Sequence, residues 1–350
     1  MKNKIAIASA FLAASSFSTA EIVINDFLSF EGFTDMSYSH TNTEVSSYSE
    51  STNSFAIDQV EISWLFDFDP VTAQIDFDYE DNDDDTVEVE QAFVNYDLGN
   101  GGTITAGRYA SMLGFEAFEP TGLYQYSFAY DVHAADEDAD LSIIPGYAQG
   151  IKYTYETANT FFGISFQDEA FDLDGGRIGG DDGGIEDASS YAVEAAFALN
   201  MDNGLSWFLG GVFEAGDDAD DESNDGDTYV INSYVTFETG AWIFAAEANY
   251  GESETERFFL EGTDEEVIQA LIMANFAYSD QASVTGRISY ADHEDNDSDL
   301  EADFLKYTLA HGYAFTDNLL LVTELSYVDG EFDNDDYESL LGAVELIFSF

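Results

Sequence analysis

The residues that could carry chemistry in this chain are mainly carboxylates. The 350 residues include 72 Asp and Glu against 8 Lys and Arg, four His and no Cys, and the formal net charge is −64. The absence of cysteine excludes a cysteine nucleophile, a disulfide scaffold and a Cys-ligated metal centre. So large a negative charge repels nucleic acid and anionic membrane surfaces and attracts cations.

The other groups that could support catalysis are few and dispersed. His40, His133, His293 and His311 are scattered along the chain without a Ser or Asp partner motif, so we predict no catalytic residues and no enzyme activity. The acidic segments also lack a calcium motif, since the closest match to an EF-hand starts at Asp221 and has Asn232 in place of the bidentate glutamate. We expect no bound metal and no cofactor.

A period of two in hydrophobicity predicts the elements that position these carboxylates. In residues 71–80 one face carries Val71, Ala73, Ile75, Phe77 and Tyr79, and the other carries Thr72, Gln74, Asp76, Asp78 and Glu80. Such alternation is typical of β-strands with one apolar and one polar face. The hydrophobic content of 45% is high enough for a folded protein despite the charge.

The same pattern recurs along the chain and predicts sixteen strands. They lie at about 27–39, 56–68, 71–80, 87–98, 103–110, 147–156, 160–168, 189–199, 205–215, 228–238, 241–251, 266–278, 282–291, 303–314, 319–328 and 338–350. The connections after even-numbered strands are short and turn-like, and those after odd-numbered strands are mostly long and acidic. Short turns at one end, long loops at the other and an even strand count are typical of a transmembrane β-barrel.

The polar faces of the strands indicate which side of this barrel contains water. Acidic residues on these faces, among them Asp76, Asp78, Glu194 and Glu247, could not pack into a dry core. Lys152, Arg287 and Lys306 alternate with apolar neighbours and therefore share the polar side. We expect an all-β antiparallel barrel of about 16 strands (range 14–18) with apolar residues facing lipid and these charged residues forming the lumen wall, together with short periplasmic turns and long acidic extracellular loops.

The N-terminal residues indicate how the protein is exported. Lys2 and Lys4 precede an apolar stretch at 5–17 that is too short to span a bilayer, and small residues at 18–20 follow it. This pattern is typical of a secretory signal peptide cleaved before Glu21. We therefore expect a signal peptide at 1–20 and a single outer-membrane barrel at 21–350.

Two segments resemble a known family. The last strand, ESLLGAVELIFSF, ends on an aromatic residue, and EQAFVNYDLGNGGTITAGRY occupies 90–109. With the strand count and the signal peptide, they make the chain similar to the sixteen-stranded porins of the Gram-negative outer membrane, such as the β-barrel porin-2 type. The resemblance implies an outer-membrane location, a homotrimer and a C-terminal Phe350 that the barrel-assembly machinery reads.

The resemblance also gives the longest connection, 110–146, a role. By strand order it is the third long loop, which in porins folds into the lumen and constricts it, and its many aromatic residues need a surface to pack against. The expected pore constriction comprises Arg108, Glu116, Glu119, Asp131 and Lys152. In general porins a basic wall faces an acidic loop, and Arg108 and Lys152 are the candidates for that wall.

These expectations describe a passive, water-filled channel that prefers cations and passes small hydrophilic solutes. Two alternatives stay open. One is a substrate-selective channel, for example for sugars, with the tyrosines of 122–130 as a stacking track. The other is a plugged structural or adhesive barrel whose acidic loops bind cations. The expected partners are outer-membrane lipid, lipopolysaccharide, cations and small solutes, with no nucleic acid.

Overall fold

The structure is a computed structural model, and it describes residues 21–46, 48–80, 87–133, 138–171, 191–216, 226–255, 257–260, 264–298, 300–333 and 335–350. The predicted signal peptide at 1–20 lies outside the described residues. The acidic connections at 81–86, 172–190 and 217–225 lie outside them as well. Within the described part, none of the helices is long and apolar enough to cross a membrane.

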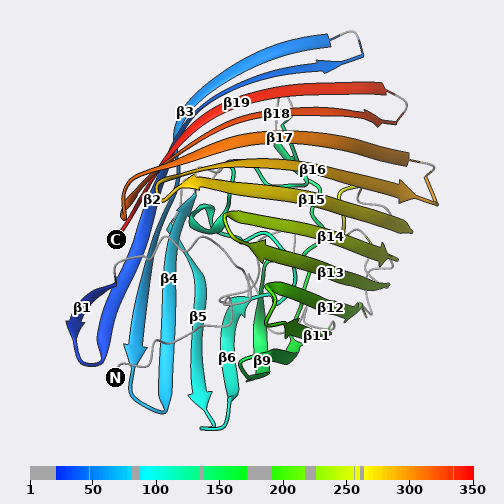
Figure 1. The fold of residues 1–350 in the computed structure, drawn as a ribbon. Helices are drawn as coiled ribbons and strands as arrows, with labels where there is room; N and C mark the ends of the chain where they lie inside the picture. Colours follow the sequence, from blue (N-terminus) through cyan, green and yellow to red (C-terminus); the bar gives the residue numbers. More distant parts are fainter. Residues whose placement is uncertain are drawn as a thin grey trace.

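Sixteen antiparallel strands close into one barrel, as the sequence predicts (Figure 1). Each predicted strand overlaps one of them. They are β2 (Leu28–Val45), β3 (Tyr48–Asp67), β4 (Val71–Glu80), β5 (Val87–Asp97), β6 (Gly102–Ala110), β9 (Tyr147–Glu156), β10 (Thr160–Gln167), β11 (Tyr191–Asn200), β12 (Leu205–Ala215), β13 (Asp227–Thr239), β14 (Trp242–Ser253), β15 (Glu265–Ser279), β16 (Ala282–Asp295), β17 (Leu300–Thr316), β18 (Leu319–Phe332) and β19 (Asp335–Ser349).

The barrel closes where the last strand meets the first. β19 pairs with β2 over a long ladder, from Ser349 opposite Phe33 to Tyr337 opposite Val45. A short additional strand, β1 (Ile22–Asn25), forms a hairpin with the start of β2. Because the first and last strands pair along almost their whole length, the sheet has no free edge at this seam.

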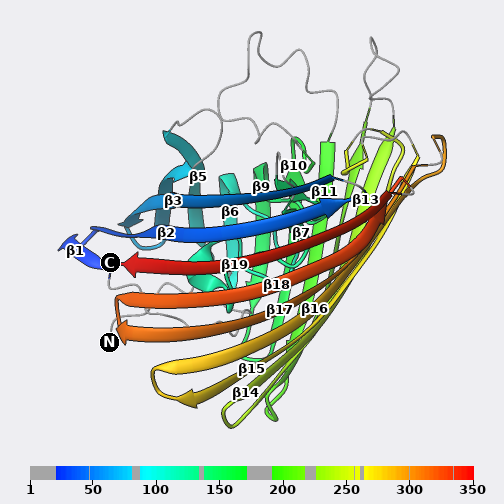
Figure 2. The same cartoon turned by 90° about the horizontal axis from the view of Figure 1, so that it is seen from above.

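Several strands are longer than the apolar pattern predicts. β2 and β3 continue through residues 40–55, which the sequence analysis left as a connection, and reach Val45 and Tyr48. β16, β18 and β19 likewise extend into segments predicted as acidic loops (Figure 2). The extensions pair polar residues such as Thr41 with Thr52, so backbone hydrogen bonds rather than apolar burial hold them together.

The two faces of the wall differ in the way expected for a barrel in lipid. Large apolar side chains are exposed on the outside, and they alternate with buried, mostly polar side chains on the inside. In β13, for example, Ile231 and Val235 are exposed outward, whereas Asn232 and Thr236 are buried within the barrel. An outward apolar band of this kind is typical of transmembrane barrels.

An apolar cluster also forms inside the barrel. Residues of the long connection, including Leu113, Leu141 and Ile143, pack against inward-facing wall residues such as Val230 and Val267. Phe171 and Phe258, from two other connections, join this cluster with their ring centroids 5.7 Å apart. The polar alternation of the wall did not predict this internal apolar core, which forms between apolar residues of the connections and inward-facing apolar residues of the strands.

Candidate pore constriction and lumen wall

The long connection starts and ends at the same level of the wall. β6 ends at Ala110 and β9 starts at Tyr147, and these two residues are paired across the ladder. Between them lie a short 3-10 helix, η1 (Pro120–Gly122), and two short strands, β7 (Asp131–His133) and β8 (Asp138–Asp140), which pair with each other. We call residues 111–146 the long loop.

Glycines in the wall make room for the start of the long loop. A Cβ atom on Gly163 would lie 2.3 Å from the Sδ atom of Met112, and one on Gly210 would lie 2.4 Å from a methyl carbon of Leu113. Both distances are far below van der Waals contact. The first residues of the loop can therefore lie directly against β10 and β12 because these wall positions have no side chain.

Wall carboxylates then hold the loop backbone. Glu194 on β11 accepts hydrogen bonds from the hydroxyl of Ser111 at 2.9 Å and from the backbone N–H of Met112 at 2.5 Å. Glu247 on β14 accepts hydrogen bonds from the N–H of Phe115 at 2.7 Å and from the Tyr130 hydroxyl at 3.2 Å. Two of the predicted lumen-wall residues are thus buried under the loop and bonded to it.

A third wall carboxylate fixes the middle of the loop. Glu324 on β18 accepts the backbone N–H of Tyr126 at 2.8 Å, that of Ser127 at 3.0 Å and the Ser127 hydroxyl at 2.6 Å. Strand parity puts Glu324 on the polar face of β18, but no role for it follows from the sequence. Hydrogen bonds to a charged acceptor are stronger than those between neutral groups, so each of these contacts contributes to holding the loop inside.

The basic residues predicted for the lumen wall also bind the long loop. Arg287 on β16 forms an ion pair with Glu116 and donates to the backbone oxygen of Phe128 at 2.8 Å. Lys306 on β17 donates to the same oxygen at 2.8 Å and to the backbone oxygen of Asp131 at 2.9 Å. Both basic side chains are buried inside the barrel.

The two basic residues that flank the loop lie at its base. Lys152 donates to the backbone oxygen of Ala110 at 3.2 Å, and its Nζ atom lies 4.2 Å from the ring centroid of Tyr109. Arg108 donates through Nε to the backbone oxygen of Glu90 at 2.7 Å and lies over the Tyr147 ring. Both side chains face inward and are buried.

The five residues predicted to form one constriction therefore contact different parts of the lumen wall. Glu116 and the backbone of Asp131 contact β16 and β17, whereas Glu119 accepts hydrogen bonds from Gln59 on β3 at 2.9 Å and from Tyr147 at 3.0 Å. The Asp131 carboxylate accepts the N–H of Phe128 within the loop at 3.3 Å. The loop thus reaches several separate parts of the wall.

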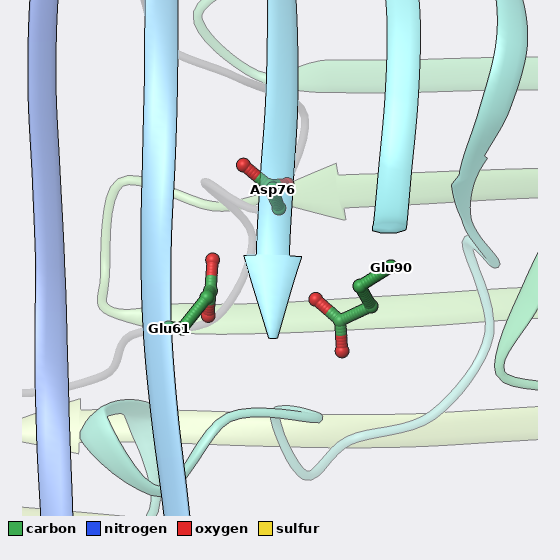
Figure 3. A group of neighbouring side chains, drawn as sticks. All are labelled: Glu61, Asp76 and Glu90. Atoms are coloured by element: carbon green, nitrogen blue, oxygen red, sulfur yellow. The ribbon is translucent and has the colours of Figure 1, made fainter. Parts of the chain in front are cut away.

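A group of carboxylates that the sequence analysis only partly identified lies where Glu119 meets the wall. Oxygen atoms of Glu61 on β3, Asp76 on β4 and Glu90 on β5 all lie within 4.8 Å of one another, and Figure 3 shows the three groups turned toward a common space. We call these three residues the β3–β5 carboxylates. Asp76 was predicted as lumen wall, but Glu61 and Glu90 were assigned no role.

Glu90 enters this group because of a β-bulge. Asp76 pairs with Gln91 and the next residue, Phe77, pairs with Val89, so Glu90 has no residue opposite it. A bulge adds one residue to a strand and redirects its side chain. Glu61 could have been identified from its strand parity with Ser63, and the two consecutive polar residues Glu90 and Gln91 mark the bulge as a break in the alternation of β5.

Hydrogen bonds to the β3–β5 carboxylates come mainly from their own wall. Asp76 accepts from the side-chain amides of Gln74 and Gln91, each at 2.9 Å, and Glu61 accepts from the Ser63 hydroxyl at 2.7 Å. Asp78, the other predicted wall acid on β4, is buried, and its charge acts on both Glu61 and Glu90. Clustered carboxylate oxygens are the ligands that hard cations such as Ca²⁺ prefer.

Two further connections cover the inside of the barrel beyond the long loop. Arg257 forms ion pairs with Glu169 at 2.9 Å and with Glu214, at the end of β12, at 3.0 Å. Glu214 also accepts the backbone N–H groups of Ala170 and Phe171. The segments at 168–171 and 257–260 are thereby connected to each other, a contact that the strand pattern does not predict.

The C-terminal residue lies at the seam of the barrel. Phe350 donates its N–H to the backbone oxygen of Gly32 and accepts the Gly32 N–H, each at 2.9 Å. Its ring centroid lies 5.9 Å from that of Phe348 and 6.2 Å from that of Phe30. These contacts place the predicted assembly residue next to β2, where the barrel closes.

The closed sixteen-stranded barrel with polar groups inside and a loop folded into it is the architecture of outer-membrane porins. A family model described as "Putative beta-barrel porin-2, OmpL-like" matches residues 28–350. The chain therefore belongs to this porin family, as the resemblance of its last strand and of residues 90–109 implied.

Solved structures support the same fold. The chain is similar to the anion-selective porin from Comamonas acidovorans, with 14% identity, a TM-score of 0.61 and coverage of 92% of this chain and 99% of that chain. It is also similar to OmpF of Salmonella typhi in complex with daunomycin, with 13% identity, a TM-score of 0.63 and coverage of 94% of this chain and 100% of that chain. The trimer form of OmpT from Vibrio cholerae has 12% identity and a TM-score of 0.57, with coverage of 92% of this chain and 99% of that chain. No curated protein sequence matches the chain.

Proposed function

We propose that this porin-family barrel is a passive outer-membrane channel that prefers cations and passes small hydrophilic solutes. The observation that carries the proposal is the charge inside the barrel. The β3–β5 carboxylates, Asp78 and the loop residue Glu119 form one acidic region. Fixed charges in a low-dielectric wall concentrate counter-ions and exclude co-ions, so small cations pass more readily than anions.

The fold itself does not decide ion selectivity. One of the similar barrels is described as anion-selective, so the shared architecture is compatible with either sign of charge. Selectivity has to come from the side chains of this chain. Because the charge of Arg287 is paired with that of Glu116, the proposed preference depends on the other carboxylates.

Planar-bilayer recordings test this proposal. Under a KCl gradient, the reversal potential should have the sign of cation selectivity and should shrink as salt is raised, because salt screens the fixed charges. A variant with Glu116→Gln, Glu119→Gln and Asp131→Asn should be less selective than the unmodified protein. Anion selectivity of the unmodified channel would refute the proposal.

A plugged barrel is a second candidate, and a specific observation favours it. The long loop is hydrogen-bonded to β3, β11, β14, β16, β17 and β18, and an apolar cluster lies inside the barrel. Such a barrel would be structural or adhesive and would bind cations on its surface. Correctly folded protein that conducts no ions in a bilayer would support this candidate over the channel.

A stacking track for sugars receives less support from the geometry. The hydroxyl of Tyr126 lies 3.3 Å from the Ser37 hydroxyl on β2, and that of Tyr130 donates to Glu247 on β14. These two tyrosines are therefore engaged by different parts of the wall. Saturable block of the channel by one class of sugar would nevertheless favour a substrate-selective function.

Assembly and export complete the proposal. The trimer form of a similar barrel supports a homotrimer, which cross-linking in detergent followed by mass measurement would test. We propose that residues 1–20 direct export and that the barrel-assembly machinery reads Phe350. We also propose outer-membrane lipid and lipopolysaccharide as its surroundings, with divalent cations between acidic side chains and anionic head groups.

A further inference from the structure

The β2–β3 hairpin extends well beyond the strand next to it. On one side, β2 pairs with β19 up to its last residue. On the other side, the pairing of β3 with β4 ends at Gln59 opposite Glu80, although β3 continues to Tyr48. Among the described residues, no strand pairs with residues 49–55 on that side, and Figure 1 shows this half of β3 at the border of the sheet.

The connection between β4 and β5 is too short to cover this half of β3. It has six residues, 81–86, within which the chain must turn and return to Val87, the partner of Tyr79. Half of that length could continue the β4 ladder by about three residues, which reaches Ala56 of β3. Residues 49–55 lie beyond this limit, and we call them the β3 edge.

Backbone groups of the β3 edge point alternately toward β2 and away from it. Thr52 is paired with Thr41, and its carbonyl oxygen lies 3.1 Å from Nδ1 of His40 on β2, so its backbone groups face β2. In an antiparallel ladder the next residue on either side turns its N–H and C=O the other way. The backbone groups of Ser51 and Asn53 therefore point to the uncovered side.

The β3 edge lacks the features that usually block the addition of a strand. It contains no Lys, Pro or Gly, and its one charged residue is Glu50. Residues 51–55 are all exposed, Phe55 to 83%. Edge strands of native proteins are commonly protected by Lys, Pro, bulges or a covering segment, because an open row of N–H and C=O groups pairs with other chains. The ligand that matches such a row is an extended polypeptide.

The surroundings of the β3 edge determine the charge of that polypeptide. On the outer face of the hairpin the apolar band ends at the paired residues Tyr38 and Phe55, and polar residues such as His40 follow. The β3 edge therefore lies outside the hydrocarbon region of the membrane. Glu44 and Glu50 lie on the same part of the hairpin, and the whole chain has a net charge of −64. This field attracts a basic segment and repels an acidic one.

We propose that the β3 edge binds an extended, basic segment of another polypeptide, which joins the sheet as a further strand. Backbone hydrogen bonds to Ser51 and Asn53 hold the segment, and the carboxylates around the edge attract its basic side chains. This interaction goes beyond the proposed channel function, and its test does not depend on conductance.

A synthetic peptide of alternating Lys and Thr residues, as long as the β3 edge, is the probe. Its dissociation constant is measured with the full-length barrel in detergent. The control peptide has the same side chains and charge but carries an N-methyl group on every residue, so it cannot donate backbone hydrogen bonds. We expect the control peptide to bind at least about tenfold more weakly. Equal dissociation constants would show attraction by charge alone and would overturn the proposal.

Two variants at one position locate the binding site. Ser51→Pro removes a backbone N–H on the uncovered side, and proline is tolerated where a strand has no neighbour. Ser51→Ala is the matched control, because it loses the same side-chain hydrogen bond to Asn42 and keeps the N–H. We expect Ser51→Pro to weaken binding of the probe at least about tenfold and Ser51→Ala to leave it unchanged.

The remaining outcomes would overturn the proposal. Equal affinity of both folded variants for the probe would place the peptide elsewhere on the acidic surface. An association between barrels that Ser51→Pro dissociates, detected by mass measurement, would make a second copy of this chain the occupant. If Ser51→Pro does not fold, the comparison is made between Asn53→Pro and Asn53→Ala, at the other position whose N–H points to the uncovered side.

Discussion

Glu116 of the long loop and Arg287 of β16 form an ion pair inside the barrel, with the Arg287 side chain fully buried. The two residues are 171 positions apart in the sequence, so the pair joins the loop to a distant part of the wall. Arg287 also donates to the backbone oxygen of Phe128, a second point on the same loop. This residue therefore orders the loop as well as contributing charge to the lumen.

Replacement of Arg287 by Met should release this part of the loop. The change leaves the Glu116 carboxylate without its cation, and breaking a buried ion pair from one side costs about 3–5 kcal/mol. We expect a larger and noisier single-channel conductance and a lower unfolding temperature. Arg287→Lys keeps the charge and should show a smaller effect on both measurements. Equal conductance and stability in all three proteins would contradict this role.

The contact between Glu324 and the loop can be tested by proteolysis. Glu324→Ala removes the acceptor for three donors of Tyr126 and Ser127, and leaving buried N–H groups without partners costs about 1–3 kcal/mol each. The loop is rich in aromatic residues, so chymotrypsin should cleave it faster in the variant. Ser127→Ala removes a single donor and should have a weaker effect. Cleavage at the unmodified rate in Glu324→Ala would show that the loop is held by other contacts.

The strand pattern could be predicted from the sequence because each transmembrane strand alternates between lipid and lumen. The polar parts of β2 and β3 were missed because both faces of the hairpin carry polar residues there, as at Thr41 and Thr52. In this region the register is set by the backbone ladder, which leaves no hydrophobic period to detect.

The site could be predicted only in part, for reasons that differ between residues. Asp76, Arg287 and Lys306 were placed inside the barrel from strand parity, and all three are buried there. The partners of Arg287 and Lys306 were not predictable, since they depend on how the long loop crosses the lumen. Glu90 alternates with Val87 and Val89 and so lies on the polar face, but the bulge opposite Asp76 and Phe77 that places it beside Asp76 is a feature of the strand pairing.

Selectivity should depend on pH through Glu119. Burial, followed by the nearby carboxylates of Glu61, Glu90 and Asp78, raises the pKa of Glu119 well above its usual value of 4.5. As the pH falls through this raised pKa, Glu119 loses its charge while ordinary exposed carboxylates keep theirs. Cation preference should therefore decrease as the pH falls through this raised pKa, at a pH where ordinary carboxylates are still charged. Glu119→Gln should make the preference less dependent on pH.

The same shift predicts the effect of pH on the position of the loop. A carboxyl group whose pKa is raised in the folded state binds its proton at a pH where the unfolded chain does not, so folding is favoured as the pH falls through that window. The contribution is lost as the pH rises through the raised pKa. Chymotrypsin cleavage of the loop should thus be slower at the acidic end of the window. A faster rate there, with the barrel intact, would argue against a buried Glu119.

The C-terminal residue should affect assembly more than the folded state. Phe350→Ala keeps the backbone pairing with Gly32 but removes the ring contacts with Phe30 and Phe348. We expect a lower yield of heat-modifiable barrel in cell membranes, with refolding from urea into detergent much less affected. Phe350→Tyr keeps an aromatic ring and is the matched control. Equal yields for all three proteins in cells would exclude a role for the terminal ring in assembly.

The central claim is that carboxylates inside an open barrel make this channel prefer cations. The reversal potential of the unmodified protein in a planar bilayer, measured between two KCl concentrations at neutral pH, tests it most directly. The account predicts an open channel whose reversal potential lies toward the potassium equilibrium potential and moves toward zero as both salt concentrations are raised. A reversal potential on the chloride side, or folded protein that conducts no ions, would contradict it.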